Sequence, residues 1–152
     1  MSGLFTVRRA GGSDIPSMFR IFNTNLDDYF APDTLEWSMM QWPAGQLVAI
    51  SFTGDTVGAL NSYIIRDGTV SLALFAVDAA YRGRGAGSAL MDTLIFQCAS
   101  HGIRRVQLEA RTTNSAAIGF YTRRGFRKLC DLPGLYNDGG DGIRMVLDLG
   151  AS

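Results

Sequence analysis

The sequence predicts one α/β domain over residues 1–152, with a mixed, mostly antiparallel sheet of six to seven strands flanked by about four helices. Two hairpin-like turns, at residues 53–55 and 67–68, join consecutive strand patterns and favour antiparallel pairing in the first half. Two strand–helix units follow, and a long helix between two strands of one sheet makes a parallel crossover. A length of 152 residues with 47% hydrophobic residues suits a single domain with one core. Helices are therefore expected on both faces of the sheet.

The first elements follow from local patterns. Residues 4–9 read as a short strand that ends at two glycines. Ser13 has the type and position of a helix N-cap, and apolar residues then recur at helical spacing, at Ile15, Met18, Phe19 and Phe22. Residues 25–30 break that pattern and predict a loop, and a second helix is expected over 33–41, before a proline.

The remaining elements continue in chain order. They are strands over residues 46–52, 56–66 and 69–77, a long helix that ends near Gly102, a strand over 104–110, a helix that starts at Asn114 and ends near residue 124, a strand from Phe126, a loop over 132–142 and a last strand over 143–149.

A turn rich in arginine and glycine joins the third of these strands to the long helix. The first N–H groups of a helix have no internal partner and carry partial positive charge, and glycines let a ligand approach them closely. The turn is therefore expected to hold an anion, most simply a phosphate. It lacks the Gly-Lys-Ser/Thr ending of a P-loop and the spacing of the dinucleotide fingerprint. A glycine-rich connection with two solvated arginines, Arg82 and Arg84, is the alternative.

A ligand with phosphates on this turn would extend back along the preceding strand, toward polar residues of the next strand and helix. Glu109 alternates with the apolar positions of its strand, and Asn114 and Tyr121 share one stripe of the following helix because they are seven residues apart. Each also has a structural interpretation: Glu109 as an ion pair with Arg105 or Arg111, Asn114 as an N-cap, and Tyr121 as a core aromatic residue.

Composition excludes several classes of protein. Lys+Arg and Asp+Glu both number 14, so no bulk attraction to nucleic acid or to a membrane surface is expected. No apolar run approaches the roughly 18 residues that span a bilayer, and the N-terminus lacks the apolar centre of a signal peptide. Cys98 and Cys130 have no metal-ligand spacing, so we expect no metal and reduced thiols in a cytoplasmic protein.

Several segments resemble the GNAT acetyltransferase superfamily. The form Arg-x-x-Gly-x-Gly, made by Arg82, Gly85 and Gly87, resembles its acetyl-CoA pyrophosphate loop. Residues 108–126 (LEARTTNSAAIGFYTRRGF) resemble the LEVR-x-x-N-x-x-A-x-x-x-Y-x-x-x-GF signature of N-terminal acetyltransferases, especially RimI-like enzymes and archaeal and eukaryotic NatA catalytic subunits. Residues 25–43 and 136–142 resemble the family's peptide-binding segments, with departures at Asp28, Leu135 and Gly140.

This resemblance implies a GNAT-type fold and transfer of an acetyl group from acetyl-CoA to the α-amine of a protein or peptide N-terminus. It implies that Glu109 is the general base, acting through water, and that Tyr121 is the general acid to the CoA thiolate. The implied cofactor-binding residues are Phe75, Ala76, Val77, Arg82, Gly83, Arg84, Gly85, Ala86, Gly87, Ser88, Asn114 and Tyr121. The implied acceptor-binding residues are Leu26, Asp28, Tyr29, Glu109 and Tyr136.

The implied partners are protein or peptide N-termini as substrates, together with an association with the ribosome or a ribosomal protein. Two other functions stay open at this point. The altered segment 135–142 also suits a small acceptor such as a polyamine, an antibiotic amine or a free amino acid. A non-catalytic, CoA-sensing domain would use Glu109 and Tyr121 only for structure.

Overall fold

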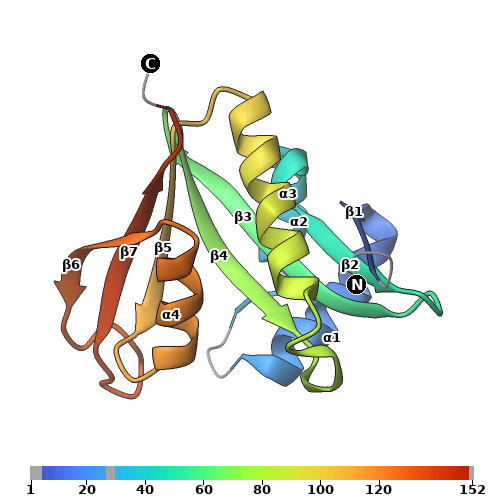
Figure 1. Ribbon diagram of the computed structural model, residues 1–152. Coiled ribbons are helices and arrows are strands. Elements are labelled where there is room, and N and C mark those ends of the chain that lie inside the picture. Colours follow the sequence, from blue (N-terminus) through green and yellow to red (C-terminus); the bar gives the residue numbers. More distant parts are fainter. Residues whose placement is uncertain (1–4, 27–29, 151–152) are drawn as a thin grey trace.

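A twisted sheet of seven strands forms the centre of the part of the chain that the structure describes. The structure is a computed structural model, which describes residues 5–26 and 30–150 (Figure 1). The strands are β1 (Phe5–Arg9), β2 (Leu47–Ser51), β3 (Thr56–Arg66), β4 (Thr69–Val77), β5 (Arg105–Arg111), β6 (Arg127–Leu132) and β7 (Gly142–Asp148). They lie in the order β1-β2-β3-β4-β5-β7-β6. Among these neighbours, β4 and β5 are parallel and the others are antiparallel, so the predicted mixed sheet is confirmed.

Helices cover both faces of this sheet. They are α1 (Ile15–Asn25), α2 (Asp33–Gln41), α3 (Ala86–Ser100) and α4 (Ser115–Arg123), with 3₁₀ turns at Gly12–Asp14, Pro43–Gly45 and Ala79–Tyr81. α1 and α2 lie on one side of the sheet and α3 on the other (Figure 1). Within residues 5–26 and 30–150, no helix combines the length and the apolar character needed to cross a lipid bilayer.

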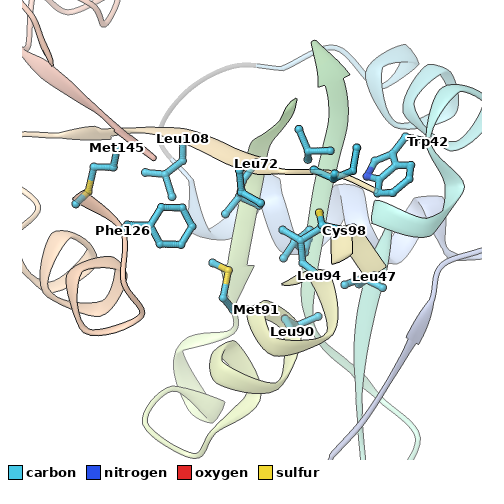
Figure 2. Close-up of a cluster of buried hydrophobic side chains, with 14 of the residues drawn as sticks. Trp42, Leu47, Leu72, Leu90, Met91, Leu94, Cys98, Leu108, Phe126 and Met145 are labelled. Atoms are coloured by element: carbon cyan, nitrogen blue, oxygen red, sulfur yellow. The ribbon is translucent and has the colours of Figure 1, made fainter. Parts of the chain in front are cut away.

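Two hydrophobic clusters hold the helices to the sheet. Successive residues of a strand point to opposite faces, so Leu47 of β2 joins the cluster under α3 while Val48 joins the cluster under α1 and α2. Figure 2 shows the α3 cluster, in which Leu94 of α3 packs with Leu72 of β4 and Leu108 of β5. The strand that contains Glu109 therefore has one face fixed by the core.

Two local expectations were wrong. Ser13 does not cap α1, because residues Gly12–Asp14 form a 3₁₀ turn and Asp14 occupies the N-cap position. The Asp14 carboxylate accepts hydrogen bonds from Arg8 at 2.8 and 3.0 Å and from the Gly11 N–H at 2.8 Å, and these contacts hold the turn. The loop expected from residue 25 begins one residue later, because the Asn25 side chain donates to the Ile21 carbonyl at 2.9 Å and extends α1.

Candidate functional site

The site is built on a gap between the parallel strands β4 and β5. The two strands pair only where Thr69–Ser71 meets Arg105–Gln107. Beyond this point β4 stays with β3 and β5 stays with β7, so the C-terminal halves of the two strands diverge (Figure 1). The register between β3 and β4 shifts by one residue at Ala73, which is the pattern of a β-bulge. Alternate peptide groups of β4 therefore face the gap instead of a neighbouring strand.

Two cavities meet in this gap. A cavity of about 840 Å³ runs along the end of β4 and the Arg/Gly turn, and a cavity of about 460 Å³ lies between β4, β5 and the β6–β7 loop. They share five lining residues, which mark the junction: Leu26, Phe75, Asn114, Ala117 and Tyr121. A long ligand in the larger cavity could thus present its end to a second molecule in the smaller one. We call these the cofactor cavity and the acceptor cavity, after the predicted residues that line them.

The Arg/Gly turn has the backbone geometry of an anion site. Gly83 and Gly85 have φ angles of 75° and 97°, a region that residues with a side chain rarely adopt. The Ala89 N–H donates to the Gly85 carbonyl at 3.0 Å, so the N–H groups of residues 86–88 precede the first helical hydrogen bond of α3. The turn forms part of the wall of the cofactor cavity, because Gly83, Gly85, Gly87 and Ser88 line it.

The remaining predicted cofactor residues divide into two groups. Phe75, Ala76, Val77, Arg82, Asn114 and Tyr121 line the cofactor cavity. Arg84 and Ala86 do not belong to that lining: the Arg84 guanidinium lies over the Tyr81 ring at 5.6 Å, and Ala86 is buried in the core with 1% of the residue exposed. The structure therefore does not place these two predicted residues on the cavity surface.

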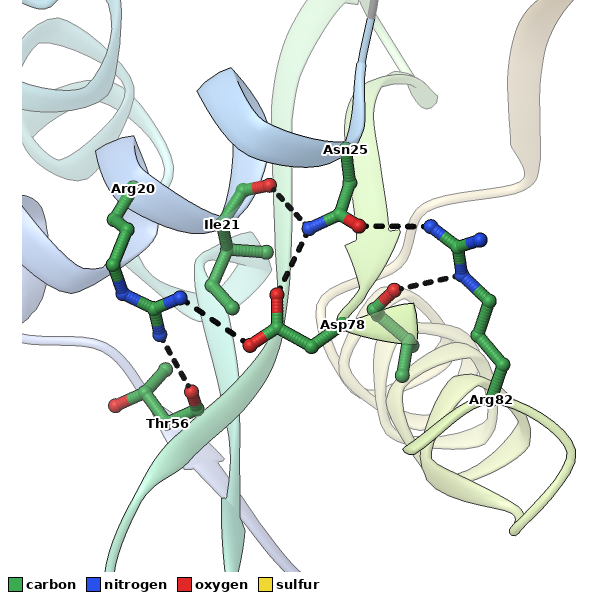
Figure 3. Close-up of polar contacts among 7 residues, drawn as sticks. Arg20, Ile21, Asn25, Thr56, Asp78 and Arg82 are labelled. Atoms are coloured by element: carbon green, nitrogen blue, oxygen red, sulfur yellow. Dashed lines mark hydrogen bonds and ion pairs between the residues drawn. The ribbon is translucent and has the colours of Figure 1, made fainter. Parts of the chain in front are cut away.

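Arg82 is held in place by neighbouring elements. Its Nε donates to the Val77 carbonyl at 3.0 Å and its Nη2 donates to the Asn25 side-chain oxygen at 2.8 Å (Figure 3). These contacts use two of the five N–H donors of a guanidinium. They orient the Arg82 side chain, which is exposed to solvent as the alternative interpretation expected, along the wall of the cofactor cavity.

Glu109 is a half-buried carboxylate on the wall of the acceptor cavity. Its Oε2 accepts a hydrogen bond from Arg144 Nε of β7 at 2.9 Å and a longer one from Gln107 at 3.4 Å. The suggested ion-pair partners Arg105 and Arg111 were wrong, since Arg105 binds Asp148 and Arg111 binds Asp138. The register explains the change, because Arg144 stands directly opposite Glu109 across the β5–β7 pair. The other carboxylate oxygen, Oε1, takes part in neither of these two hydrogen bonds.

Tyr121 and Asn114 lie at the junction of the two cavities, as their seven-residue spacing predicted. The Tyr121 ring packs against Phe75, Phe120 and Phe126 at centroid distances of 6.4, 5.6 and 5.6 Å. Burial, together with the nearby Tyr136, raises the pKa of the Tyr121 hydroxyl to about 12, so the hydroxyl keeps its proton at neutral pH. Asn114 is also the N-cap of α4, because its side-chain oxygen accepts from the Ala117 N–H at 3.1 Å.

The β6–β7 loop forms part of the wall of the acceptor cavity. Tyr136 lines it as predicted, and so do Leu135 and Asn137. The loop is tied to the end of β5, because the Arg111 guanidinium lies 4.0 Å from the Tyr136 ring centre and bonds both carboxylate oxygens of Asp138 at 3.1 Å. Leu26 also lines this cavity, whereas the predicted residues Asp28 and Tyr29 lie outside the described residues.

Some residues of the site escaped sequence reasoning. Arg144 and Asn25 carry no local signal, since their partners Glu109 and Arg82 are 35 and 57 positions away in the sequence. The charge of Arg144, between the apolar residues Ile143 and Met145, is the one feature that could have indicated a polar partner on a neighbouring strand. Within the described residues, no group of three or more His, Cys, Asp or Glu side chains could hold a metal ion.

Comparison with known proteins agrees with this geometry. The chain matches the acetyltransferase (GNAT) family over residues 15–126. It is 28% identical over 148 residues to human N-alpha-acetyltransferase 30, covering 93% of this chain and 40% of that protein, so the chain spans less than half of this relative. A Bacillus subtilis protein, named as a candidate alanine N-acetyltransferase of ribosomal protein bS18, is 24% identical over 135 residues. That alignment covers 89% of this chain and 89% of the relative. The crystal structure of Ard1 from Thermoplasma volcanium superposes with a TM-score of 0.91 at 32% identity, covering 97% of this chain and 99% of that one.

Proposed function

The chain belongs to the acetyltransferase (GNAT) family, and we propose that it transfers an acetyl group from acetyl-CoA to the α-amine of a protein or peptide N-terminus. The observation that carries this proposal is the junction of two cavities at Tyr121, with a phosphate-type turn at the far end of one and Glu109 on the wall of the other. The names of the relatives support the choice of an α-amine as acceptor.

The cofactor cavity fits CoA in three respects. The N–H groups of residues 86–88 and the Arg82 guanidinium suit a diphosphate. The open edge of β4 offers peptide groups, around Phe75 and Val77, to the amide-containing pantetheine arm, which Asn114 would also contact. Bound acetyl-CoA supplies an activated acetyl thioester, and the shared lining at Tyr121 supports delivery of that end to the acceptor cavity.

Glu109 is proposed to act as the general base. An α-amine has a pKa of about 8, against about 10.4 for a lysine, so near neutral pH only a modest base is needed to obtain its neutral form. The Glu109 carboxylate lies on the acceptor cavity and is oriented by Arg144 at 2.9 Å. It can accept the amine proton through one bridging water.

Tyr121 is proposed to act as the general acid. Because its pKa is raised to about 12, the hydroxyl carries its proton throughout the neutral range and can give it to a leaving thiolate. Peptide N–H groups of β4 near Phe75 and Val77 would stabilise the negative charge that develops on the acetyl oxygen. Glu109 lines the acceptor cavity and Tyr121 lines both cavities, which supports direct transfer from acetyl-CoA to the amine.

The wider setting is also a proposal. The protein partners would be substrates that offer a free N-terminus, and the bS18-directed relative supports a test with ribosomal proteins. A cytoplasmic location and a single domain over residues 1–152 remain predictions of the sequence.

Activity on peptides tests the proposal. Purified protein is incubated with labelled acetyl-CoA and peptide pairs of identical sequence, one with a free α-amine and an acetylated internal lysine, the other with a blocked α-amine and a free lysine. We expect acetylation of the first peptide only. Preferential acetylation of the second peptide would contradict the proposal.

A small amine is the second candidate acceptor, and the size of the acceptor cavity favours it. About 460 Å³ admits a whole polyamine or amino acid as well as the first residues of a peptide. Turnover of spermidine or free amino acids at rates near those of peptides would favour this function. Tight binding of CoA without transfer to any amine, unchanged by Tyr121→Phe, would favour the non-catalytic one.

A further inference from the structure

We propose that Asn25 is a positioning residue that couples the cofactor cavity to the acceptor side of the site. The inference rests on the proposed function, because its ligand is CoA. Asn25 is the last residue of α1 and lines the cofactor cavity, and the next residue, Leu26, lines both cavities. The Asn25 side chain therefore lies between the Arg/Gly turn and Leu26, which lines both cavities.

The first half of the link joins Asn25 to the Arg/Gly turn. The Asn25 side-chain oxygen accepts a hydrogen bond from Arg82 Nη2 at 2.8 Å, while Arg82 Nε donates to the Val77 carbonyl at 3.0 Å (Figure 3). Together these bonds fix the direction of the guanidinium at the wall of the cofactor cavity. Without them, a diphosphate would have to order a long and flexible side chain when it binds.

The second half joins Asn25 to the end of β4. Its amide nitrogen donates to Asp78 Oδ1 at 2.9 Å and to the Ile21 carbonyl of the preceding helical turn at 2.9 Å. The other carboxylate oxygen of Asp78 accepts from Arg20 at 3.3 Å, and Arg20 also donates to the Thr56 carbonyl at 2.9 Å (Figure 3). The network thus ties α1, β3, β4 and the turn together.

The polarity of this network leaves one arrangement of the Asn25 amide. Its oxygen faces a guanidinium and its nitrogen faces a carboxylate, so a flipped amide would oppose donor to donor and acceptor to acceptor. Arg20, Asp78 and Arg82 together carry one net positive charge, which favours an anion at the cavity wall. A diphosphate that binds Arg82 would order its guanidinium, and the hydrogen bond from Arg82 to Asn25 would then order Asn25 and the last turn of α1. Coupling of this kind is reciprocal, so order at that turn favours cofactor binding.

Two measurements test the coupling without any acceptor. Hydrogen–deuterium exchange is followed at the amides of residues 22–26, with and without saturating CoA, and the CoA dissociation constant is measured by calorimetry. In the unchanged protein, CoA is expected to slow exchange at this turn. Asn25→Ala should abolish most of that protection and weaken CoA binding about threefold to tenfold, the range expected for loss of one hydrogen bond at an exposed position. Asn23→Ala, at an exposed position of the same helix, is the matched control and should match the unchanged protein.

An exchange of partners separates positioning from general damage to the fold. Asn25→Asp alone places two carboxylates together, and Asp78→Asn alone leaves two amides. In the double variant the carboxylate at position 25 accepts from Arg82 and from the new amide at position 78, which in turn accepts from Arg20. In the unchanged protein the Asn25 nitrogen also donates to the Ile21 carbonyl at 2.9 Å, which a carboxylate cannot do. We therefore expect Asn25→Asp alone to lose CoA-dependent protection and the double variant to regain part of it. Asp78→Asn alone should lose less, because its amide oxygen can still accept from Asn25.

Each outcome has one meaning. If the unchanged protein does not bind CoA, the proposed function fails. If it binds CoA and Asn25→Ala keeps both the affinity and the protection seen in Asn23→Ala, the coupling role of Asn25 is refuted. Failure of the double variant to exceed Asn25→Asp, with all proteins folded by thermal melting, would refute it as well.

Discussion

Replacing Tyr121 by phenylalanine removes one hydroxyl from the junction of the two cavities and leaves the ring. The contacts of the ring with Phe75, Phe120 and Phe126 involve carbon atoms only, so phenylalanine preserves them. Binding of acetyl-CoA should therefore change little. The proton that the hydroxyl would give to the leaving thiolate is lost.

The magnitude follows from the task of that proton. A positioned general acid contributes roughly 10²–10⁴-fold to a rate. A simple thiol has a pKa of about 8.5, so a thiolate is already a fair leaving group and the lower end of that range applies. We expect kcat to fall about 100-fold, which is about 2.7 kcal/mol of transition-state stabilisation at about 1.36 kcal/mol for each tenfold change. The KM for acetyl-CoA should stay within about threefold, because the variant loses an interaction used in the transition state.

The assay is steady-state acetylation of the best peptide found in the α-amine test. The acetyl-CoA concentration is varied at each of several pH values between about 6.5 and 9.5. Tyr63→Phe is the matched control, since Tyr63 lies on β3 outside the linings of both cavities and packs on Trp37. Because the Tyr121 pKa is about 12, deprotonation of this group should not reduce activity within that pH range.

Two results would refute this reasoning. One is a kcat for Tyr121→Phe within threefold of that of the unchanged protein. The other is an alkaline loss of activity with an apparent pKa near 9 that disappears in Tyr121→Phe, because it would mean that the hydroxyl titrates far below its expected range.

Three further predictions concern other groups. Glu109→Gln should lower kcat/KM at pH 7 by about 10²-fold. Its melting curve should stay close to that of the unchanged protein, because the glutamine side chain can still accept a hydrogen bond from Arg144. Equal activity of the two proteins would exclude Glu109 as the base. Asp14→Asn should lower the free energy of unfolding by about 1–2 kcal/mol in urea titrations at pH 7, because Arg8 is half exposed and solvent screens the pair. Because Arg8 lowers the pKa of Asp14 in the folded protein, the stabilisation is fully present above the unfolded-state pKa of about 4 and is lost as the pH falls through the lower folded-state pKa. A stability difference between the two proteins that persists unchanged at pH 2 would contradict this prediction. A thiol reagent at pH 8 should modify one cysteine of the folded protein, the half-exposed Cys130, because burial raises the pKa of the Cys98 thiol to about 12; mass spectrometry that finds Cys98 modified first would be the contrary result.

Local chemistry determined the order and bounds of most elements. Segments 33–41, 56–66 and 69–77 were predicted with the bounds that the structure has, because each is a periodic apolar run bounded by turn residues or a proline. The start of α1 was missed because Asp14 is held by Arg8, six residues earlier, and not by a local cap. A side chain with a tertiary partner can outweigh the preference of its own segment.

The candidate site shows the same division. The sequence by itself determined the Arg/Gly turn, the shared stripe of Asn114 and Tyr121, and the family, because these depend on spacing within one segment. Only the tertiary structure decided that β4 and β5 separate after three paired residues, that Arg144 rather than a neighbour binds Glu109, and that Asn25 holds Arg82. The physical reason is that strand divergence and cross-strand register depend on how helices and bulges pack against the whole sheet, and no single segment encodes that packing.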